Sequence, residues 1–108
     1  MTACRDGVRS YWDEEDITYV WEIGDDGWVT RSVELIGAER RPQTAAAFDE
    51  VIRERDTGSI QAVRAYEARY GVLVEKPIDD WAFPHKDVTQ AEFERVWADA
   101  RRALTARW

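Results

Sequence analysis

Cysteine and histidine are almost absent from this chain of 108 residues, which contains one of each, Cys4 and His85. A single cysteine excludes an internal disulfide and a thiolate metal cluster within one chain. A single histidine likewise excludes a site with two or three histidine ligands. The chain also lacks an apolar run as long as a signal peptide or a membrane span. We therefore expect a cytoplasmic protein with no bound metal, no cofactor and no membrane partner.

Glycine-rich catalytic motifs are absent as well. The sequence contains no phosphate-binding G-x-x-x-x-G-K-[ST] loop, no G-x-G-x-x-G dinucleotide motif and no G-x-S-x-G nucleophile elbow. The common nucleotide-dependent enzymes and the serine hydrolases of that type therefore have no support in the sequence.

Negative charge, by contrast, is abundant and concentrated near the N-terminus. The net charge is −7, and residues 1–36 contain nine acidic residues against three arginines. A field of this sign repels phosphate backbones and anionic lipids, and it attracts basic proteins and cationic small molecules. We therefore expect a basic protein partner and no nucleic-acid ligand, although an acidic surface can also serve solubility alone.

Six tryptophans are an unusual number for a chain of this length. Tryptophan is seldom fully buried because its indole N–H needs a partner, and it is enriched at the centres of protein interfaces. We expect three of the six in the core and three at the surface. The core set is Trp21, Trp97 and Trp108, and the surface set is Trp12, Trp28 and Trp81.

The apolar pattern predicts one domain, residues 1–108, in which residues 1–10 are flexible. Residues 17–23 are rich in β-branched and aromatic residues and predict a strand. Residues 28–36 predict a second strand, because Val29, Arg31, Val33 and Leu35 alternate with the other residues and share one face. Gly24–Gly27 has the composition of the hairpin turn between them. A third strand is expected at 72–75.

Helical spacing predicts two helices over residues 44–70, the second one closed by Gly71. Thr89–Glu92 has the capping-box pattern that opens a C-terminal helix. The resulting order, ββααβα, predicts an α+β fold. It is a small, mainly antiparallel sheet, a hairpin plus a third strand, packed by about three helices.

A surface rich in acidic and aromatic residues is the first candidate site. Aromatic rings beside carboxylates bind cations, and carboxylates steer basic partners while aromatic rings supply buried area. The candidate binding residues are Trp12, Glu14, Glu15, Asp25, Asp26, Trp28 and Trp81. This hypothesis describes a non-catalytic bacterial binding protein. Self-association into a homodimer through the C-terminal helix is a further hypothesis.

Acid–base chemistry is the alternative. Glu22 lies between Trp21 and Ile23, and a carboxylate among apolar neighbours can acquire a raised pKa. Glu22, Glu34 and His85 would then serve a small cofactor-free enzyme or ligand-binding protein of bacterial specialised metabolism. Its pocket would lie between sheet and helices, and the lining residues would be Tyr19, Trp21, Phe48, Tyr66 and Trp97. An ion pair of either carboxylate with an arginine is the structural alternative.

Two segments of the chain, EIGDDGWVTRSVELIG and EFERVW, resemble those of a family of small bacterial domains with no assigned function. The matching features are an acidic hairpin followed by R-x-V-E and a helix with E-F-E-x-x-W. They fall on residues 22, 31, 33, 34, 93 and 97. The resemblance implies a role in binding, of the accessory or immunity type, in which an acidic protein masks a basic toxin. The helical middle, residues 44–70, departs from the family pattern.

Overall fold

A five-stranded antiparallel sheet forms the centre of the protein. The computed structural model describes residues 6–12, 16–24, 27–73 and 86–106. The strands lie in the order β4-β3-β2-β1-β5, and every neighbouring pair is antiparallel. Their bounds are Asp6–Trp12 for β1, Ile17–Ile23 for β2, Val29–Ile36 for β3, Arg41–Ala47 for β4 and Lys86–Val88 for β5.

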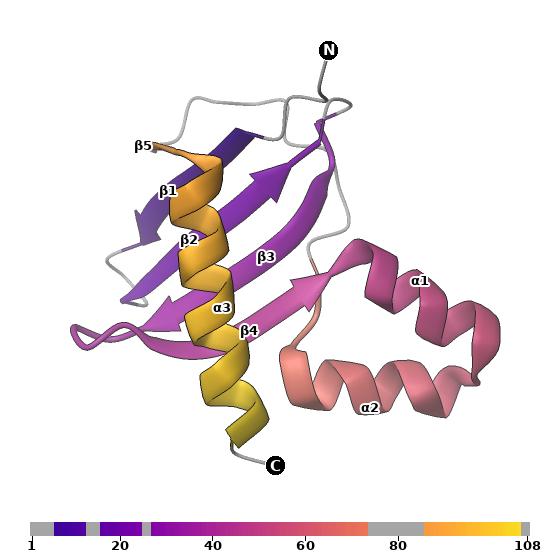
Figure 1. Cartoon of the computed structure of the whole chain (residues 1–108). Helices are drawn as coiled ribbons and strands as arrows, with labels where there is room; N and C mark the ends of the chain where they lie inside the picture. The colour runs from indigo at the N-terminus through magenta and orange to yellow at the C-terminus, as the bar shows by residue number, and fades with distance from the viewer. Residues whose placement is uncertain (1–5, 13–15, 25–26, 74–85, 107–108) are drawn as a thin grey trace.

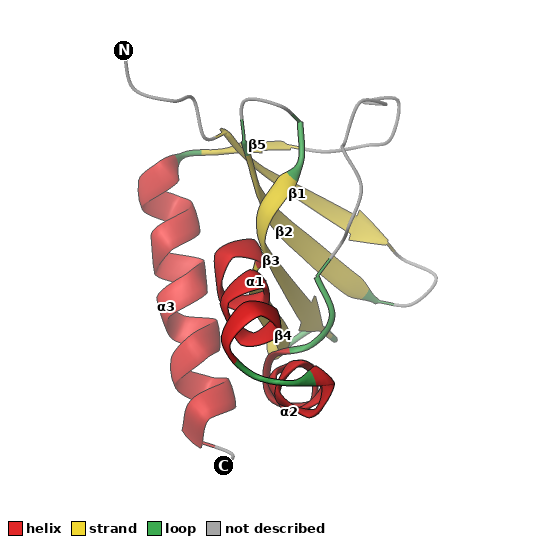
Figure 2. Cartoon of the chain, turned by 90° about the vertical axis from the view of Figure 1, so that its right-hand side faces the viewer, coloured by secondary structure: helices red, strands yellow, loops and turns green. Residues whose placement is uncertain are grey.

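The helices cover one face and one edge of this sheet. Their bounds are Phe48–Thr57 for α1, Ile60–Tyr70 for α2 and Gln90–Ala106 for α3. Helix α3 crosses one face of the sheet, whereas α1 follows β4 directly and forms a helical hairpin with α2 beside the β4 edge (Figure 1). The view turned by 90° shows α3 in a layer of its own against the sheet (Figure 2).

The face of the sheet under α3 carries one apolar cluster. Val20, Val33 and Ala45 are direct neighbours across β2, β3 and β4, and their side chains pack against Phe93 and Leu104 of α3. These residues are almost completely buried. Their burial supplies the apolar contact that holds α3 on the sheet.

The opposite face carries a second apolar cluster. Val8, Ile23 and Ala46 come from three different strands and pack with Tyr66 of α2 and with Leu73. Alanine is present at 45, 46 and 47, where β4 has neighbours on both faces. Its small side chain lets the helices and the strand approach closely.

The predicted fold class is confirmed. Strand β2 has the predicted bounds, β3 begins one residue later than expected, and two helices occupy most of the predicted helical middle. The turn between β2 and β3 uses a positive φ at Gly27, and the N–H of Gly24 donates to the carbonyl of Trp28. The capping box is also present: Glu92 N–H donates to the Thr89 hydroxyl, and Thr89 N–H donates to the Glu92 carboxylate.

Three strands, β1, β4 and β5, were not predicted. Residues 1–10 were expected to be flexible, and this is wrong from Asp6 onward, because β1 pairs with both β2 and β5 inside the sheet. Residues 44–47 were expected to open a helix, but Arg41–Ala47 forms β4. Alanine favours helices intrinsically, and here the pairing of β4 with β3 outweighs that preference.

The strand predicted at 72–75 is also wrong in its described part. Gly71 ends α2 with a φ of 89°, and Val72 and Leu73 lie in no strand. Val72 is exposed while Leu73 is buried in the second apolar cluster. The three-residue strand β5 is present instead, at the edge beside β1. In the described ranges, none of the helices combines the length and apolarity that crossing a membrane requires.

Candidate functional site

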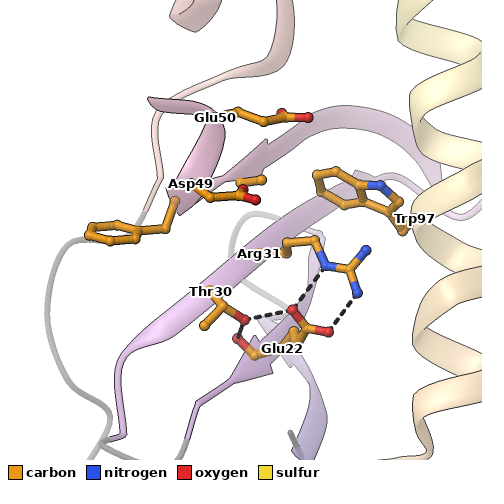
Figure 3. A pocket seen from close by; sticks show the side chains of 8 residues that line it. Glu22, Thr30, Arg31, Asp49, Glu50 and Trp97 are labelled. Carbon is orange, nitrogen blue, oxygen red and sulfur yellow. Dashed lines mark hydrogen bonds and ion pairs between the residues drawn. The ribbon is translucent and has the colours of Figure 1, made fainter. Parts of the chain in front are cut away.

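A cleft of about 400 Å³ opens where β2 and β3, the start of α1 and the middle of α3 meet. We call it the acidic cleft, because three carboxylates and one guanidinium line it (Figure 3). Its lining residues are Glu22, Thr30, Arg31, Ala47, Phe48, Asp49, Glu50 and Trp97. The cleft thus lies between sheet and helices, where the sequence predicted a pocket. Of the five predicted lining residues, Phe48 and Trp97 line it, and Tyr19, Trp21 and Tyr66 do not.

Glu22 and Arg31 form a two-point ion pair at the floor of this cleft. They are direct cross-strand neighbours, and Arg31 Nε and Nη2 donate to Glu22 Oε1 and Oε2 at 2.9 and 2.6 Å. The Thr30 hydroxyl adds a bond to Oε1 at 2.6 Å, and the Gln90 amide adds one to Oε2 at 2.8 Å. Each carboxylate oxygen therefore accepts at least two hydrogen bonds, which fills its normal capacity.

Helix α3 completes this network from above. Glu94 accepts from Arg31 Nη1 at 3.1 Å and also from Nη2, and Gln90 donates to Glu94 at 2.9 Å. Arg31 is therefore held between a carboxylate of the sheet and a carboxylate of the helix. The first turns of α3 are tied by polar contacts to the same two strands that carry the apolar cluster.

These contacts decide the charge of Glu22. The side chain is 1% exposed, and burial alone raises the pKa of a carboxyl. The hydrogen bonds from Arg31, Gln90 and Thr30 outweigh that effect and lower the pKa of Glu22 from 4.5 to about 2. Burial acts in the opposite sense on Arg31, but Glu22 and Glu94 raise its pKa further above its usual range. Both groups are therefore charged at neutral pH.

A second network closes the other wall of the cleft. Arg101 of α3 forms an ion pair with Glu50 of α1, and the Tyr66 hydroxyl donates to Glu50 at 2.6 Å. Burial raises the pKa of the Glu50 carboxyl, but the bonds from Arg101 and Tyr66 outweigh it and leave the pKa lowered. Burial and the bond to Glu50 raise the pKa of Tyr66 above its ordinary value.

The side chains of Arg101 and Tyr66 also cover the outer edge of β4. Arg101 Nε donates to the carbonyl of Ala45 at 2.8 Å, and the N–H of Ala47 donates to the Tyr66 hydroxyl at 2.9 Å. An edge strand otherwise presents such groups to other chains. The edge of the sheet is therefore blocked by side chains at these two positions.

Trp97 stands between the two networks. The guanidinium of Arg31 lies 5.1 Å from the centre of its ring, and that of Arg101 lies 4.4 Å from it. Both distances are within the range of cation–π attraction. The ring is half-buried, packs beside the apolar cluster under α3 and forms part of the cleft wall.

Asp49 is the carboxylate of the cleft that forms no ion pair with the described residues. It is exposed in the first turn of α1. Among the described residues it takes part in no hydrogen bond and no ion pair, whereas Glu22 and Glu50 are each paired with an arginine. Asp49 is therefore the acid of this cleft that is available to a ligand.

An apolar groove of about 400 Å³ adjoins the acidic cleft. We call it the aromatic groove; its lining residues are Trp28, Phe48, Val51, Ile52, Arg55, Val63 and Glu67. Trp28 is 41% exposed and Phe48 is 47% exposed, which is high for residues of this size. Phe48 lines both hollows, so the acidic cleft and the aromatic groove form one continuous surface.

The predicted binding surface is only partly described by the structure. Trp28 is exposed, as expected, and it lines the aromatic groove. Trp12 ends β1, and its side chain lies outside the described part of the chain. The other predicted binding residues, Glu14, Glu15, Asp25, Asp26 and Trp81, lie outside the described residues.

Glu22 and Glu34, two of the three predicted catalytic residues, do not lie together. Glu22 pairs across the sheet with Arg31, whereas Glu34 pairs with Tyr19, three residues earlier in β2. Because side chains alternate along a strand, Glu22 and Glu34 point to opposite faces of the sheet. His85, like Trp108, lies outside the described residues. The raised pKa proposed for Glu22 is also wrong, and the structural alternative, an ion pair with an arginine, is correct for this residue.

Comparisons with protein-family models, with curated proteins and with solved structures find no match for this chain. The resemblance of its hairpin and C-terminal helix to small bacterial domains therefore stays a prediction.

Several residues of the site were not predicted. Asp49, Glu50 and Arg101 lie in ordinary amphipathic helices, and their positions around the cleft depend on how α1 turns away from the sheet. The one available signal was the pair of acids just after Phe48, in the first turn of a helix, where carboxylates are favoured.

Proposed function

We propose that this chain is a non-catalytic bacterial binding protein that engages a basic protein partner through the surface around Phe48. One observation carries the proposal. The acidic cleft, which contains the exposed carboxylate of Asp49, adjoins a groove in which Trp28 and Phe48 are exposed. Protein interfaces commonly combine buried aromatic anchors with charges that orient the partner. An accessory or immunity role, in which the partner is masked, belongs to the same proposal.

The charge balance of the cleft supports a basic partner. Four carboxylates and three guanidiniums lie in and beside it. They are Glu22, Asp49, Glu50 and Glu94 against Arg31, Arg101 and Arg53, which acts on Glu50 from the same helix. The local excess of negative charge has the same sign as the net charge of −7. Such a field increases the association rate of a basic protein and weakens as salt is added.

The state of Glu22 favours binding over acid–base chemistry. A general acid or base works best when its pKa is near the working pH. The pKa of Glu22 is about 2, and its oxygens are occupied by Arg31, Gln90 and Thr30. A group in this state holds the fold together and does not exchange protons near neutral pH.

The proposal is tested by affinity purification from a lysate of the organism that encodes the chain. Wild-type protein, Phe48→Ala and Ile60→Ala are immobilised side by side and washed at low and high salt. Ile60 is the matched control, because it is 67% exposed, apolar and outside both hollows. We expect wild type and Ile60→Ala to retain the same basic protein at low salt, and Phe48→Ala to lose most of it.

Two results would contradict the proposal. The first is a partner that Phe48→Ala retains as well as wild type does, because the binding surface would then lie elsewhere. The second is a retained small molecule in place of a protein, because that would favour a ligand-binding role for the acidic cleft. Circular dichroism of each variant excludes unfolding as the cause of lost binding.

A further inference from the structure

The two hollows are arranged so that one segment of a partner can fill both. Phe48 is the first residue of α1, and its half-exposed ring forms a wall of the acidic cleft on one side and of the aromatic groove on the other. The next residue is Asp49, which faces the cleft, and the next turn of the helix brings Val51 and Ile52 to the groove. A chain crossing Phe48 therefore passes from a negative hollow to an apolar one.

The acidic cleft is suited to one additional positive group. Glu22 and Glu50 are already neutralised by Arg31 and Arg101, and Asp49 is the exposed carboxylate that remains. A guanidinium or ammonium group placed beside Asp49 would gain an ion pair. The carboxylates in and beside the cleft outnumber the guanidiniums, so the group would enter a region of negative net charge.

The aromatic groove is suited to an uncharged group. Five of its seven lining residues are apolar: Trp28, Phe48, Val51, Ile52 and Val63. The other two, Arg55 and Glu67, carry opposite charges, so the groove has no net charge. An aliphatic or aromatic side chain placed there would cover the apolar surface.

We infer that the partner docks through a single segment that carries both a basic and an apolar side chain. The basic side chain occupies the acidic cleft beside Asp49, and the apolar side chain occupies the aromatic groove against Trp28. Phe48 lies beneath the backbone that joins them. This inference rests on the proposed function and deepens it, because it names the chemistry of the recognised segment.

Selection of peptides tests this inference without knowledge of the natural partner. A library of random peptides of about twelve residues is displayed on phage and selected against the wild-type chain. We expect the selected peptides to share an arginine or lysine and a large apolar residue at a fixed separation. Substituting either one by alanine in a synthetic copy should weaken binding, measured by fluorescence polarisation.

Variants of the chain assign each peptide residue to its hollow. Asp49→Asn should weaken binding of the basic peptide by roughly two- to fivefold, as for an exposed ion pair, and should not change binding of its alanine-substituted copy. Phe48→Ala should weaken binding of both peptides by about tenfold or more, as for a central anchor. Asp87→Asn, an exposed acid in β5 outside both hollows, is the matched control and should change neither Kd.

Three results would overturn the inference. One is selected peptides without a basic residue; another is equal sensitivity of both peptides to Asp49→Asn. The third is a chain that is dimeric by light scattering and becomes monomeric on Phe48→Ala, since a second copy would then occupy the surface. The first two would leave the proposed function intact if affinity purification still depends on Phe48, so the two failures are distinguishable.

Discussion

Glu22 and Arg31 face each other across β2 and β3 and share two hydrogen bonds, at 2.9 and 2.6 Å, inside the protein. The pair does more than neutralise two charges. Through Glu94 and Gln90 it also ties the beginning of α3 to the middle of the sheet. The floor of the acidic cleft is therefore a structural element, and the ligand-accessible chemistry lies on its rim, at Asp49 and Phe48.

Removal of the charge on Glu22 should destabilise the fold strongly. Glu22→Gln keeps the shape of the side chain but leaves the half-buried Arg31 with Glu94 as its remaining carboxylate. Breaking a buried ion pair in this way costs about 3 kcal/mol. Asp99→Asn is the matched control, because the Asp99–Arg102 pair is exposed and should contribute less than about 1 kcal/mol. Urea unfolding measures both, and equal losses would contradict the structural role of Glu22.

Acid should remove the contribution of Glu22 in a defined window. Its pKa is lowered from 4.5 to about 2, so the folded state prefers the charged form more than the unfolded state does. The resulting stability is fully present above pH 4.5 and is lost as pH falls towards 2. It amounts to about 3 kcal/mol, at roughly 1.4 kcal/mol per pKa unit.

The measurement is the free energy of unfolding of wild type and Glu22→Gln between pH 7 and pH 2. Wild type should lose stability more steeply than the variant, so that the two curves approach each other at the acid end. The lowered pKa of Glu50 adds the same slope to both proteins, because Glu50 lies in the other network. The charge of Glu22 raises the pKa of Glu94, so Glu22→Gln lowers the pKa of Glu94 further and its slope is not shared. Parallel curves over the whole range would show that Glu22 is not the group responsible.

The hydroxyl of Tyr66 should matter more than that of Tyr70. Tyr66→Phe removes the acceptor of the Ala47 N–H and a donor to Glu50, and it leaves the ring in place. A buried donor without its partner costs about 1–3 kcal/mol. Tyr70→Phe is the control, because Tyr70 makes ring contacts with Arg101 and Tyr66 that phenylalanine preserves. Thermal unfolding of the two variants compares them, and a smaller loss for Tyr66→Phe would be inconsistent with the edge contact.

Gly71 and Gly37 form a matched pair of glycines with positive φ, at 89° and 80°. A Cβ at Gly71 would lie 2.3 Å from Cγ2 of Thr44, whereas a Cβ at Gly37 meets nothing within 4 Å. Gly37→Ala should therefore cost about 1 kcal/mol from backbone strain alone. Gly71→Ala adds overpacking and should cost about 3 kcal/mol or more. Equal losses by urea unfolding would argue against the close approach of α2 to β4.

The sequence predicted the parts of the fold whose signals are local. The β-branched and aromatic composition of 17–23, the glycine turn after it, and the capping box at Thr89 each depend on neighbouring residues, and each is confirmed. Strands β1 and β4 were not predicted, because their stability comes from pairing with neighbouring strands and not from a local sequence pattern. Arg41–Ala47 contains a proline and three alanines, which indicate a strand only when β3 lies beside them.

The candidate site was predictable only in part, for a related reason. Trp28, Phe48 and Trp97 stood out in the sequence as large aromatic residues, and all three line the two hollows. The choice between acid–base group and ion pair at Glu22 depended on Arg31 being its direct neighbour across the strands. The β2–β3 register determines which residue lies opposite Glu22. A bulge interrupts this register directly after Glu22, so that Glu22 pairs with Arg31 and Ile23 pairs with Val29. The positions of Asp49 and Glu50 in the site depend on where α1 leaves the sheet, which the sequence does not show.

The central claim is that the surface around Phe48 is where a partner binds. The most direct test is a ¹H–¹⁵N NMR titration of the chain with the basic protein obtained by affinity purification. We predict that the indole signals of Trp28 and Trp97 and the amides of Phe48 and Asp49 shift together. The amides of β5, at the opposite edge of the sheet from β4, should stay in place. Shifts confined to β5 would contradict the claim.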